Sequence, residues 1–126
     1  MHRVLTPDGR IGIADLTVSG PLPAALQGIA AWVACVADAQ PAQRYAAILA
    51  EAGFARIAVD DHNDAMAKLI EDIQAKLIGV SVMAGLGKID LGDIDLGAGR
   101  TMARAARQAT RDGLLGYCLL TAARSL

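Results

Sequence analysis

The densest group of chemically reactive side chains runs from Asp60 to Asp64 and reads Asp-Asp-His-Asn-Asp. Carboxylate, amide and imidazole groups at this spacing could hold a hard divalent cation, which takes mainly oxygen ligands. Acidic residues ahead of an apolar-periodic segment are also typical of a helix start, where they satisfy free N–H groups and complement the helix dipole. The second interpretation explains every residue except His62, and we favour a helix cap over a metal site.

The two thiols, Cys35 and Cys118, are far apart in the sequence and form no closely spaced metal-binding pair. Both lie in apolar stretches, which predicts small buried side chains in a reducing cytoplasm. His2 has no reactive neighbour in the sequence, and we expect it in a mobile terminus. No Ser-His-Asp, Cys-His or paired-carboxylate arrangement is recognisable.

A basic stripe follows from four arginines spaced four, three and four residues apart: Arg100, Arg104, Arg107 and Arg111. This spacing places them on one face of a helix, where they could contact phosphate groups. An ordinary amphipathic surface helix gives the same pattern, and no aromatic residues interleave. The net charge of −1 adds no general attraction to nucleic acid, so nucleic-acid binding is the weaker interpretation.

The elements that must position these groups alternate between strands and helices. We expect strands over 10–18, 55–60 and 114–123, and helices over 21–38, 41–53, 61–84 and 98–112, with the repeat Ile-Asp-Leu-Gly between the last two helices as a loop with matched turns. The first strand is a near-continuous apolar run, which predicts burial on both faces. It follows a Pro7–Gly9 turn in which Gly9 supplies the backbone freedom. The helix expected over 61–84 should show an apolar stripe of Met66, Leu69, Ile70, Ile73, Leu77 and Val80.

Composition predicts one soluble, cytoplasmic domain over residues 1–126, with a helical insert over about 64–112. The chain is 54% hydrophobic but only 3% aromatic, and its mean hydropathy of +0.38 is high for a soluble protein. No segment has the length of a membrane span or the pattern of a signal peptide. The excess of apolar residues indicates a surface that another molecule covers.

Four segments together resemble the C-terminal half of class I S-adenosylmethionine-dependent methyltransferases, most closely the arsenite-methyltransferase-like branch. They are R-V-L-T-P-D-G-R-I-G-I-A-D from Arg3, W-V-A-C-V-A-D-A-Q from Trp32, I-L-A-E-A-G-F from Ile48 and G-L-L-G-Y-C-L-L-T-A from Gly113. The resemblance implies a partial Rossmann-like α/β fold with three strands, the last one antiparallel, and about five helices. It also implies S-adenosylmethionine as the cofactor.

The resemblance further implies roles for two residues. Cys35 would correspond to an arsenite-binding cysteine, although such a site needs several thiolates and a buried helix cysteine is the favoured interpretation. Asp15 ends the first strand, and in open α/β sheets ligands bind at the carboxyl ends of strands. Asp15 is therefore a candidate for the substrate side, with a polar strand end as an equally good alternative.

The family's glycine-rich cofactor loop has no counterpart here, because the glycines of Gly85–Gly99 follow a helix rather than a strand. The first four strands of the family are absent from this sequence. We therefore expect a methyltransferase-like portion that is not catalytically competent alone and binds no cofactor by itself. The alternatives are one half of a split methyltransferase, completed by an upstream half, and a non-enzymatic module that dimerises or binds a partner.

A homodimer is expected on physical grounds. The family's neighbour of the strand Arg10–Val18 is missing, which leaves unpaired backbone groups on an apolar strand without charge or proline between Ile11 and Ala14. Two copies could pair this strand antiparallel. The long helix that starts near Asp64 is the alternative contact.

Overall fold

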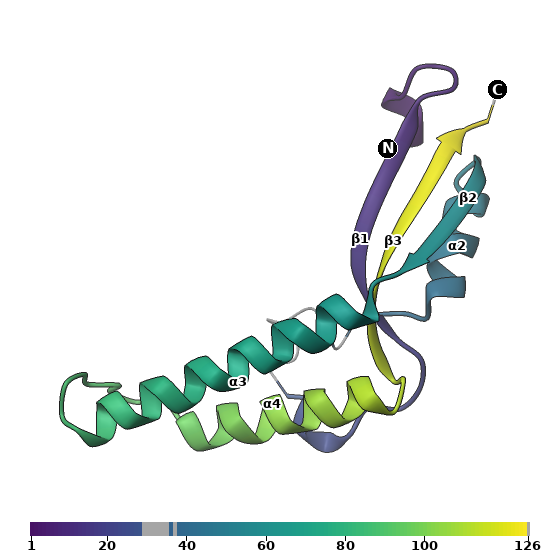
Figure 1. Ribbon diagram of the computed structural model, residues 1–126. Helices are drawn as coiled ribbons and strands as arrows, with labels where there is room; N and C mark the ends of the chain where they lie inside the picture. Colours follow the sequence, from purple (N-terminus) through teal and green to yellow (C-terminus); the bar gives the residue numbers. More distant parts are fainter. Residues whose placement is uncertain (29–35, 37, 126) are drawn as a thin grey trace.

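A computed structural model describes residues 1–28, 36 and 38–125 of the chain (Figure 1). They form one three-stranded sheet with three α-helices and two short 3-10 helices, which confirms the α/β fold class with fewer α-helices than the five helices predicted. The elements are η1 (His2–Val4), β1 (Arg10–Val18), η2 (Ala24–Leu26), α2 (Ala42–Glu51), β2 (Phe54–Asp61), α3 (Asn63–Gly85), α4 (Leu96–Arg111) and β3 (Leu115–Arg124).

The strand order is β1-β3-β2, and the central strand β3 is antiparallel to both neighbours. Residues pair from Arg10 with Ala123 to Val18 with Leu115 along the first ladder. Strands β1 and β2 therefore run in the same direction, and their carboxyl ends meet at one end of the sheet. Helix α3 leaves from this end, so the sheet and the helical hairpin form an L in Figure 1.

In the turn before β1, the residue with a positive φ is Asp8 and not, as was expected, Gly9. Asp8 has the left-handed φ of 61°, whereas Gly9 is needed because a Cβ there would lie 2.8 Å from the carbonyl oxygen of Thr6. Aspartate tolerates left-handed φ better than most residues. The turn thus depends on Asp8 for its conformation and on Gly9 for close packing.

The predicted burial of β1 on both faces is confirmed only at its carboxyl end, where Thr17 and Val18 are both buried. Nearer its start, Ile11 and Ile13 are half-buried toward α2, while the alternate residues Gly12 and Ala14 are exposed. Among the described residues no layer covers the other face of this part of the strand. An apolar run that consists of small residues on one face cannot be distinguished from a doubly buried strand by composition alone.

His2 was expected in a mobile terminus, but it packs against the sheet. Its ring lies edge-on to Phe54, with the ring centroids 5.2 Å apart, and its Nε2 is buried beside Gly53. The N-terminal segment is thus part of the packed structure.

Helices α3 and α4 form an antiparallel hairpin that projects from the sheet. Helix α4 begins at Leu96, earlier than predicted, because the Asp95 carboxylate accepts a hydrogen bond of 3.0 Å from Ala98 N. In the first copy of the Ile-Asp-Leu-Gly repeat, Asp90 instead accepts from Gly92 N at 2.9 Å within the loop. The two copies therefore have different structures: Asp90 of the first copy forms a turn, and Asp95 of the second copy caps the start of α4.

Two groups of buried residues stabilise the fold. The α2 core lies between the sheet and α2 and comprises Leu49, Phe54, Cys118, Leu120 and Ala122. The hairpin core lies between the end of the sheet, η2, α3 and α4 and comprises Val18, Leu26, Val36, Met66, Ile70, Ala109 and Leu115. Only η2 represents the helix predicted over 21–38, since residues 29–35 and 37 lie outside the described part.

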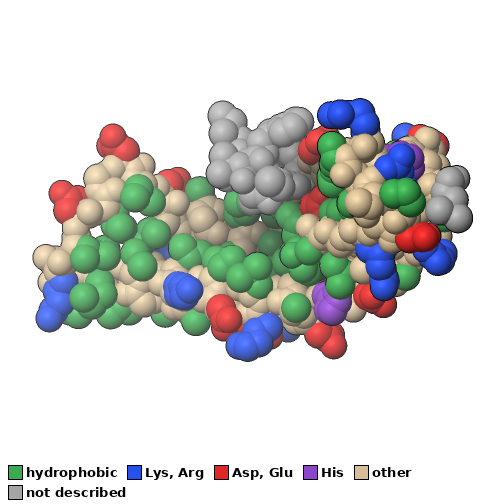
Figure 2. All heavy atoms as spheres, turned by 90° about the horizontal axis from the view of Figure 1, so that it is seen from above, with side chains coloured by type: hydrophobic (Ala, Val, Ile, Leu, Met, Phe, Trp, Pro, Cys, Tyr) green, Lys and Arg blue, Asp and Glu red, His purple; other side chains and the backbone are tan. Residues whose placement is uncertain are grey.

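The apolar stripe predicted on α3 is only partly buried. Met66 and Ile70 are buried, whereas Leu69 is 53% and Ile73 is 42% exposed. Figure 2 shows hydrophobic side chains gathered along the surface of the hairpin. The described helices include none that is both long and apolar enough to span a bilayer. The hairpin therefore carries much of the exposed apolar surface that the high hydropathy indicated.

Candidate functional site

An apolar cavity of about 220 Å³ lies at the carboxyl end of β1, between the sheet and the hairpin. Leu16 forms the side of the wall that belongs to β1, and Leu26 forms the side that belongs to η2. The remaining lining comes from the hairpin, β3 and Val36: Met66, Leu69, Ile70, Ile73, Gly99, Met102, Ala103, Ala106 and Leu115. The described residues of this wall include no ionisable side chain, so the part of the cavity that they form suits an apolar group.

Asp15 was predicted on the substrate side of the sheet, but Asp15 and its neighbour Leu16 point to opposite faces. Leu16 lines the cavity, whereas Asp15 pairs with Cys118 across the ladder on the face that α2 covers. The Asp15 carboxylate accepts a hydrogen bond of 2.7 Å from Leu16 N. Alternation along a strand separates consecutive residues, so Asp15 is placed beside the α2 core rather than in the cavity.

Tyr45 of α2 connects the end of β1 to the start of its own helix. Its hydroxyl donates to Leu16 O at 3.0 Å and accepts from Gln40 N at 3.0 Å. Burial raises the pKa of Tyr45, and the nearby Asp15 carboxylate raises it further. The sequence analysis did not identify these contacts, because the pattern of apolar residues along a helix carries no information about the partners of the Tyr45 hydroxyl.

Cys118 is buried, with 3% of its surface exposed, and is a free thiol. Burial is the main cause that raises its pKa, and the carboxylates of Asp15 and Asp61 add to the effect. A thiol that stays protonated is a poor nucleophile and a poor ligand for soft metals. Cys35 lies outside the described residues, so the arsenite site suggested by the resemblance has one described thiol, and that thiol faces away from the cavity.

The Asp60–Asp64 segment forms a junction rather than a simple cap. His62 is the N-cap residue and makes no side-chain cap bond, while Asp61 accepts from Asn63 N at 2.7 Å and from Asn63 Nδ2 at 3.1 Å. Asn63 Oδ1 in turn accepts from Tyr117 N at 2.9 Å, which ties α3 to β3. In the described part of the chain no three His, Cys, Asp or Glu side chains lie close enough to hold a metal ion.

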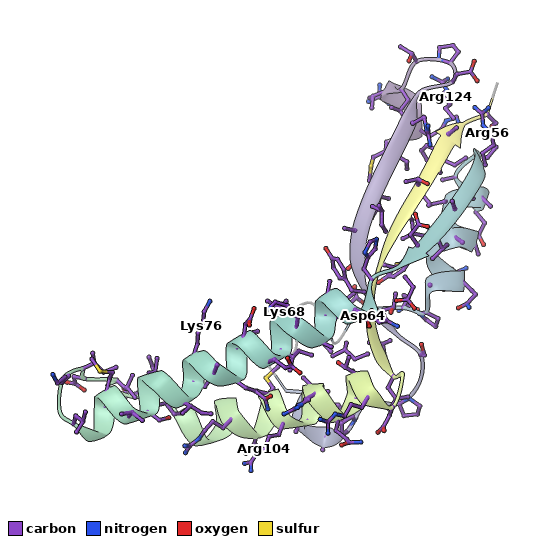
Figure 3. All side chains as sticks on the ribbon, in the orientation of Figure 1. Arg56, Asp64, Lys68, Lys76, Arg104 and Arg124 are labelled. Atoms are coloured by element: carbon purple, nitrogen blue, oxygen red, sulfur yellow. The ribbon has the colours of Figure 1, made fainter. Side chains whose placement is uncertain are left out.

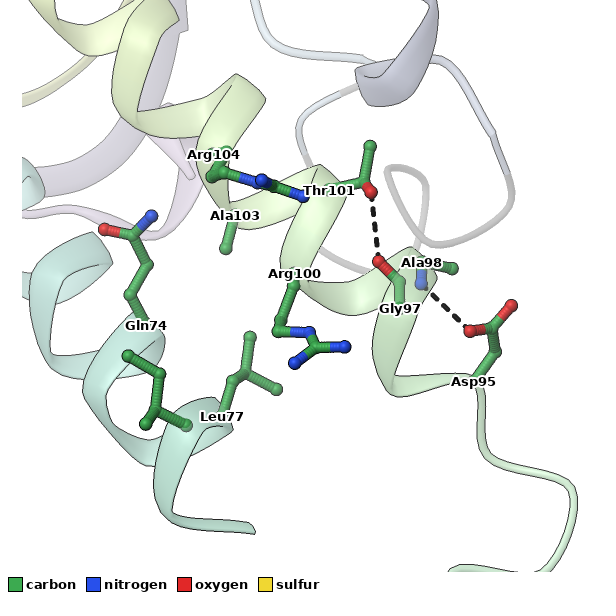
Figure 4. A pocket seen from close by; sticks show the side chains of 10 residues that line it. Gln74, Leu77, Asp95, Gly97, Ala98, Arg100, Thr101, Ala103 and Arg104 are labelled. Carbon is green, nitrogen blue, oxygen red and sulfur yellow. Dashed lines mark hydrogen bonds between the residues drawn. The ribbon is translucent and has the colours of Figure 1, made fainter. Parts of the chain in front are cut away.

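The arginine stripe borders an open groove of about 780 Å³ between α3 and α4 (Figure 4). Arg100 and Arg104 line it together with Gln74 and the carboxylate of Asp95. A guanidinium nitrogen of Arg107 on α4 lies 3.9 Å from the carboxylate oxygen Oε1 of Glu71 on α3. Figure 3 places Arg104 on one side of the hairpin and Lys68 and Lys76 on the other. The mixed charges and the open shape are those of a solvated helix face.

No protein-family model matches the chain. Its fold is similar to several solved methyltransferase structures. One is phosphoethanolamine N-methyltransferase 2 of Haemonchus contortus, in complex with phosphomonomethylethanolamine and S-adenosylhomocysteine, with a TM-score of 0.70 and 15% identity over 99% of this chain and 28% of that chain. Another is a protein of Galdieria sulphuraria assigned as a sarcosine dimethylglycine methyltransferase, with a TM-score of 0.73 and 18% identity over 98% of this chain and 44% of that chain.

A cyclopropane synthase of Mycobacterium tuberculosis is similar as well, with a TM-score of 0.64 and 17% identity over 98% of this chain and 47% of that chain. The chain thus spans less than half the length of each of these structures. At this level of identity the similarity establishes the fold and leaves the activity open. The three strands and the helical hairpin have the arrangement of one part of a methyltransferase fold.

Proposed function

We propose that the chain is the acceptor-side portion of an S-adenosylmethionine-dependent methyltransferase and that it does not bind the cofactor alone. The observation that carries the proposal is the apolar cavity at the carboxyl end of β1. Ligands of open α/β sheets bind in a crevice at the carboxyl ends of the strands. The similarity in fold to methyltransferase structures supports the choice of this enzyme class.

Cofactor binding is assigned to residues that this chain does not supply. A nucleotide-like cofactor is held where a glycine-rich turn joins a strand to a helix, since bare backbone there can approach the ligand closely. Among the described residues, β2 passes into α3 through His62 without a glycine, and β1 is followed by the 3-10 helix η2. These residues would come either from a longer form of the protein or from a separate half.

The arsenite-methyltransferase-like branch is the finer form of this proposal, and it rests on the four sequence segments that resemble that branch. An arsenite acceptor would require Cys35 and further thiolates from outside the chain, because Cys118 is buried on the α2 face. The cavity itself favours an apolar acceptor group. The two acceptors can be separated by titration with arsenite and with an apolar probe.

The isolated chain is expected not to bind S-adenosylhomocysteine. The reason is the absence of a strand, glycine-rich turn and helix among the described elements. Isothermal titration calorimetry should give no saturable heat up to about 1 mM ligand, which corresponds to a binding free energy weaker than about 4 kcal/mol. A tighter dissociation constant would show that the chain holds a cofactor site of its own.

The cavity is expected to bind a small apolar probe such as indole. Cavities lined by Leu, Ile and Met take up aromatic molecules, because apolar walls hold water poorly. Ligand-observed NMR should report saturable binding of indole with a dissociation constant below about 1 mM. The substitution Ala106→Leu, which fills the cavity from α4, should abolish this binding.

The matched control for this experiment is Ala98→Leu on the same helix. Ala98 is exposed and lines the open groove instead of the cavity, so this variant should bind indole like the wild type. Equal loss of binding in both variants, or no binding to the wild-type chain, would refute the assignment of the cavity as an acceptor site.

A second candidate function is a non-enzymatic module that dimerises or binds a partner. The observation that favours it is the exposed edge of β1, where Gly12 and Ala14 are uncovered among the described residues. The two functions require different partners for the edge of β1. An acceptor-side portion needs a cofactor-binding part beside it, and a module needs only its own partner.

A further inference from the structure

The two outer edges of the sheet differ in how they are protected. The edge strand β2 contains a bulge between Ala55 and Ala58, where Arg56 has a left-handed φ of 51°. Arg56, Asp60 and Asp61 also place exposed charges on this strand. Bulges and charges at an edge prevent another strand from pairing with it. The edge of β2 is therefore closed to strand addition.

The register of β1 determines which of its backbone groups face outward. Gly9 O accepts from Arg124 N at 2.8 Å, and Ser19 N donates to Leu114 O at 2.9 Å. In an antiparallel ladder every second residue exchanges hydrogen bonds with its partner. The odd-numbered residues of β1 are thus bonded to β3, and the even-numbered residues direct their N–H and C=O groups to the outer edge.

Three outward backbone groups near the carboxyl end of β1 have hydrogen-bond partners within the chain. Leu16 N donates to the Asp15 carboxylate at 2.7 Å, and Leu16 O accepts from the Tyr45 hydroxyl at 3.0 Å. Val18 N donates to Gln40 O at 3.2 Å. Asp15, Tyr45 and Gln40 thereby close this part of the edge.

Gly12 and Ala14 form the open part of the edge. Both are exposed, both face outward, and their backbone groups have no partner among the described residues. Neither side chain blocks the approach of another strand, and no charge or proline lies between Ile11 and Ala14. Such an edge is a template for strand addition.

We propose that the occupant of this edge is β1 of a second copy of the chain, antiparallel and related by a two-fold axis. Pairing of β1 with β1 closes after two copies, because both copies use the same edge. Pairing of β1 with β2 would instead continue without end, and the bulge and charges of β2 oppose it. The result is one continuous sheet that runs through both copies.

The residue types on β1 are compatible with a register centred on Gly12. In this register Gly12 lies opposite the partner's Gly12, and Arg10 lies opposite the partner's Ala14. Ile11 lies opposite the partner's Ile13, so apolar side chains meet on the α2 face and no like charges face each other. All outward backbone groups of Arg10, Gly12 and Ala14 are then used, and Leu16, which is already satisfied, stays outside the pair.

The inference does not depend on the acceptor cavity, which lies beyond the closed part of the edge. A separate cofactor-binding half that added a strand to β1 would use the same backbone groups. The dimer and such a completed enzyme would therefore exclude one another.

The test combines light scattering with hydrogen exchange. Size-exclusion chromatography with light scattering should give twice the chain mass of 13.0 kDa for the wild type. Exchange measured by NMR should show slow exchange of the Ala14 amide in the dimer. The Val59 amide, which faces the free edge of β2 because His62 N bonds to Tyr117 O, should exchange fast.

The substitution Ala14→Pro removes the outward N–H and places a ring at the edge, which an edge strand tolerates. We expect a folded monomer by light scattering and circular dichroism. Val59→Pro is the matched control at the outward-facing position of the other edge and should remain a dimer.

A monomeric wild type at about 100 μM would overturn the proposal. A wild-type dimer with a fast-exchanging Ala14 amide would also overturn it and would place the contact on the hairpin. If Ala14→Pro fails to fold, the exchange of the Ala14 and Val59 amides in the wild type still decides between these outcomes.

Discussion

Replacing Gly116 by alanine is expected to lower the free energy of unfolding by about 2–4 kcal/mol. A Cβ at this position would overlap the side-chain amide of Asn63 and lie 2.7 Å from Thr17 Oγ1. Asn63 would have to move, and its hydrogen bond of 2.9 Å from Tyr117 N would be lost. Urea unfolding followed by circular dichroism, at a fixed protein concentration, measures the change.

The control is Gly79→Ala within α3. A Cβ on Gly79 would meet nothing within 4 Å, and alanine has a higher helix propensity than glycine. This variant is expected to gain up to about 1 kcal/mol. If Gly116→Ala is as stable as the wild type, the Asn63 contact does not hold α3 against β3 as described.

The three strands and the helices α2, α3 and α4 were predicted because their local signals are strong. β1 begins and ends at Arg10 and Val18 as predicted, since a turn precedes it and a Gly-Pro pair follows it. α2 and β3 agree with the predictions to within about two residues. Helix boundaries that depend on a single cap are harder to predict, and Asp95 illustrates this, because only its contact with Ala98 N separates it from the loop aspartate Asp90.

Which layer covers a strand depends on the rest of the fold and could not be predicted from the strand itself. The run from Ile11 to Ala14 is apolar throughout, yet only one of its faces is covered in the described part of the chain. The same limit applies to α3, where the apolar spacing is helical but Leu69 and Ile73 remain exposed. A hydrophobic pattern identifies apolar surface that is more stable when it is buried, but it does not identify the element or molecule that buries it.

At the candidate site, the sequence indicated the end of the sheet to consider, but it did not indicate which side chains lie there. The carboxyl end of β1 was predicted as the ligand side, because open α/β sheets bind ligands there, and the apolar cavity lies at this end. A role for Asp15 in binding a substrate stays a prediction, and alternation along the strand turns Asp15 toward Cys118 and leaves Leu16 facing the cavity. The Tyr45 hydroxyl could not be assigned from sequence, because its partners Leu16 and Gln40 are brought to it only by the packing of α2 on the sheet.

The burial of β3 leads to the second prediction of large effect, Leu120→Ala. Leu120 is 1% exposed and lies at the centre of the α2 core. Removing its isobutyl group from so closed a site should cost about 2–5 kcal/mol of unfolding free energy, through lost burial and the cavity that remains. Thermal and urea unfolding should both show the loss.

The neighbouring substitution Leu119→Ala is the matched control, because it makes the same chemical change on the same strand. Leu119 points to the opposite face, where it is only partly buried and lies 4.0 Å from the position of a Cβ on Gly12. Less apolar surface is lost there and no enclosed cavity forms, so the expected cost is below about 1.5 kcal/mol. Equal costs at the two positions would mean that the outer face of β3 is also covered in solution, which is the result expected only if a partner packs on that face.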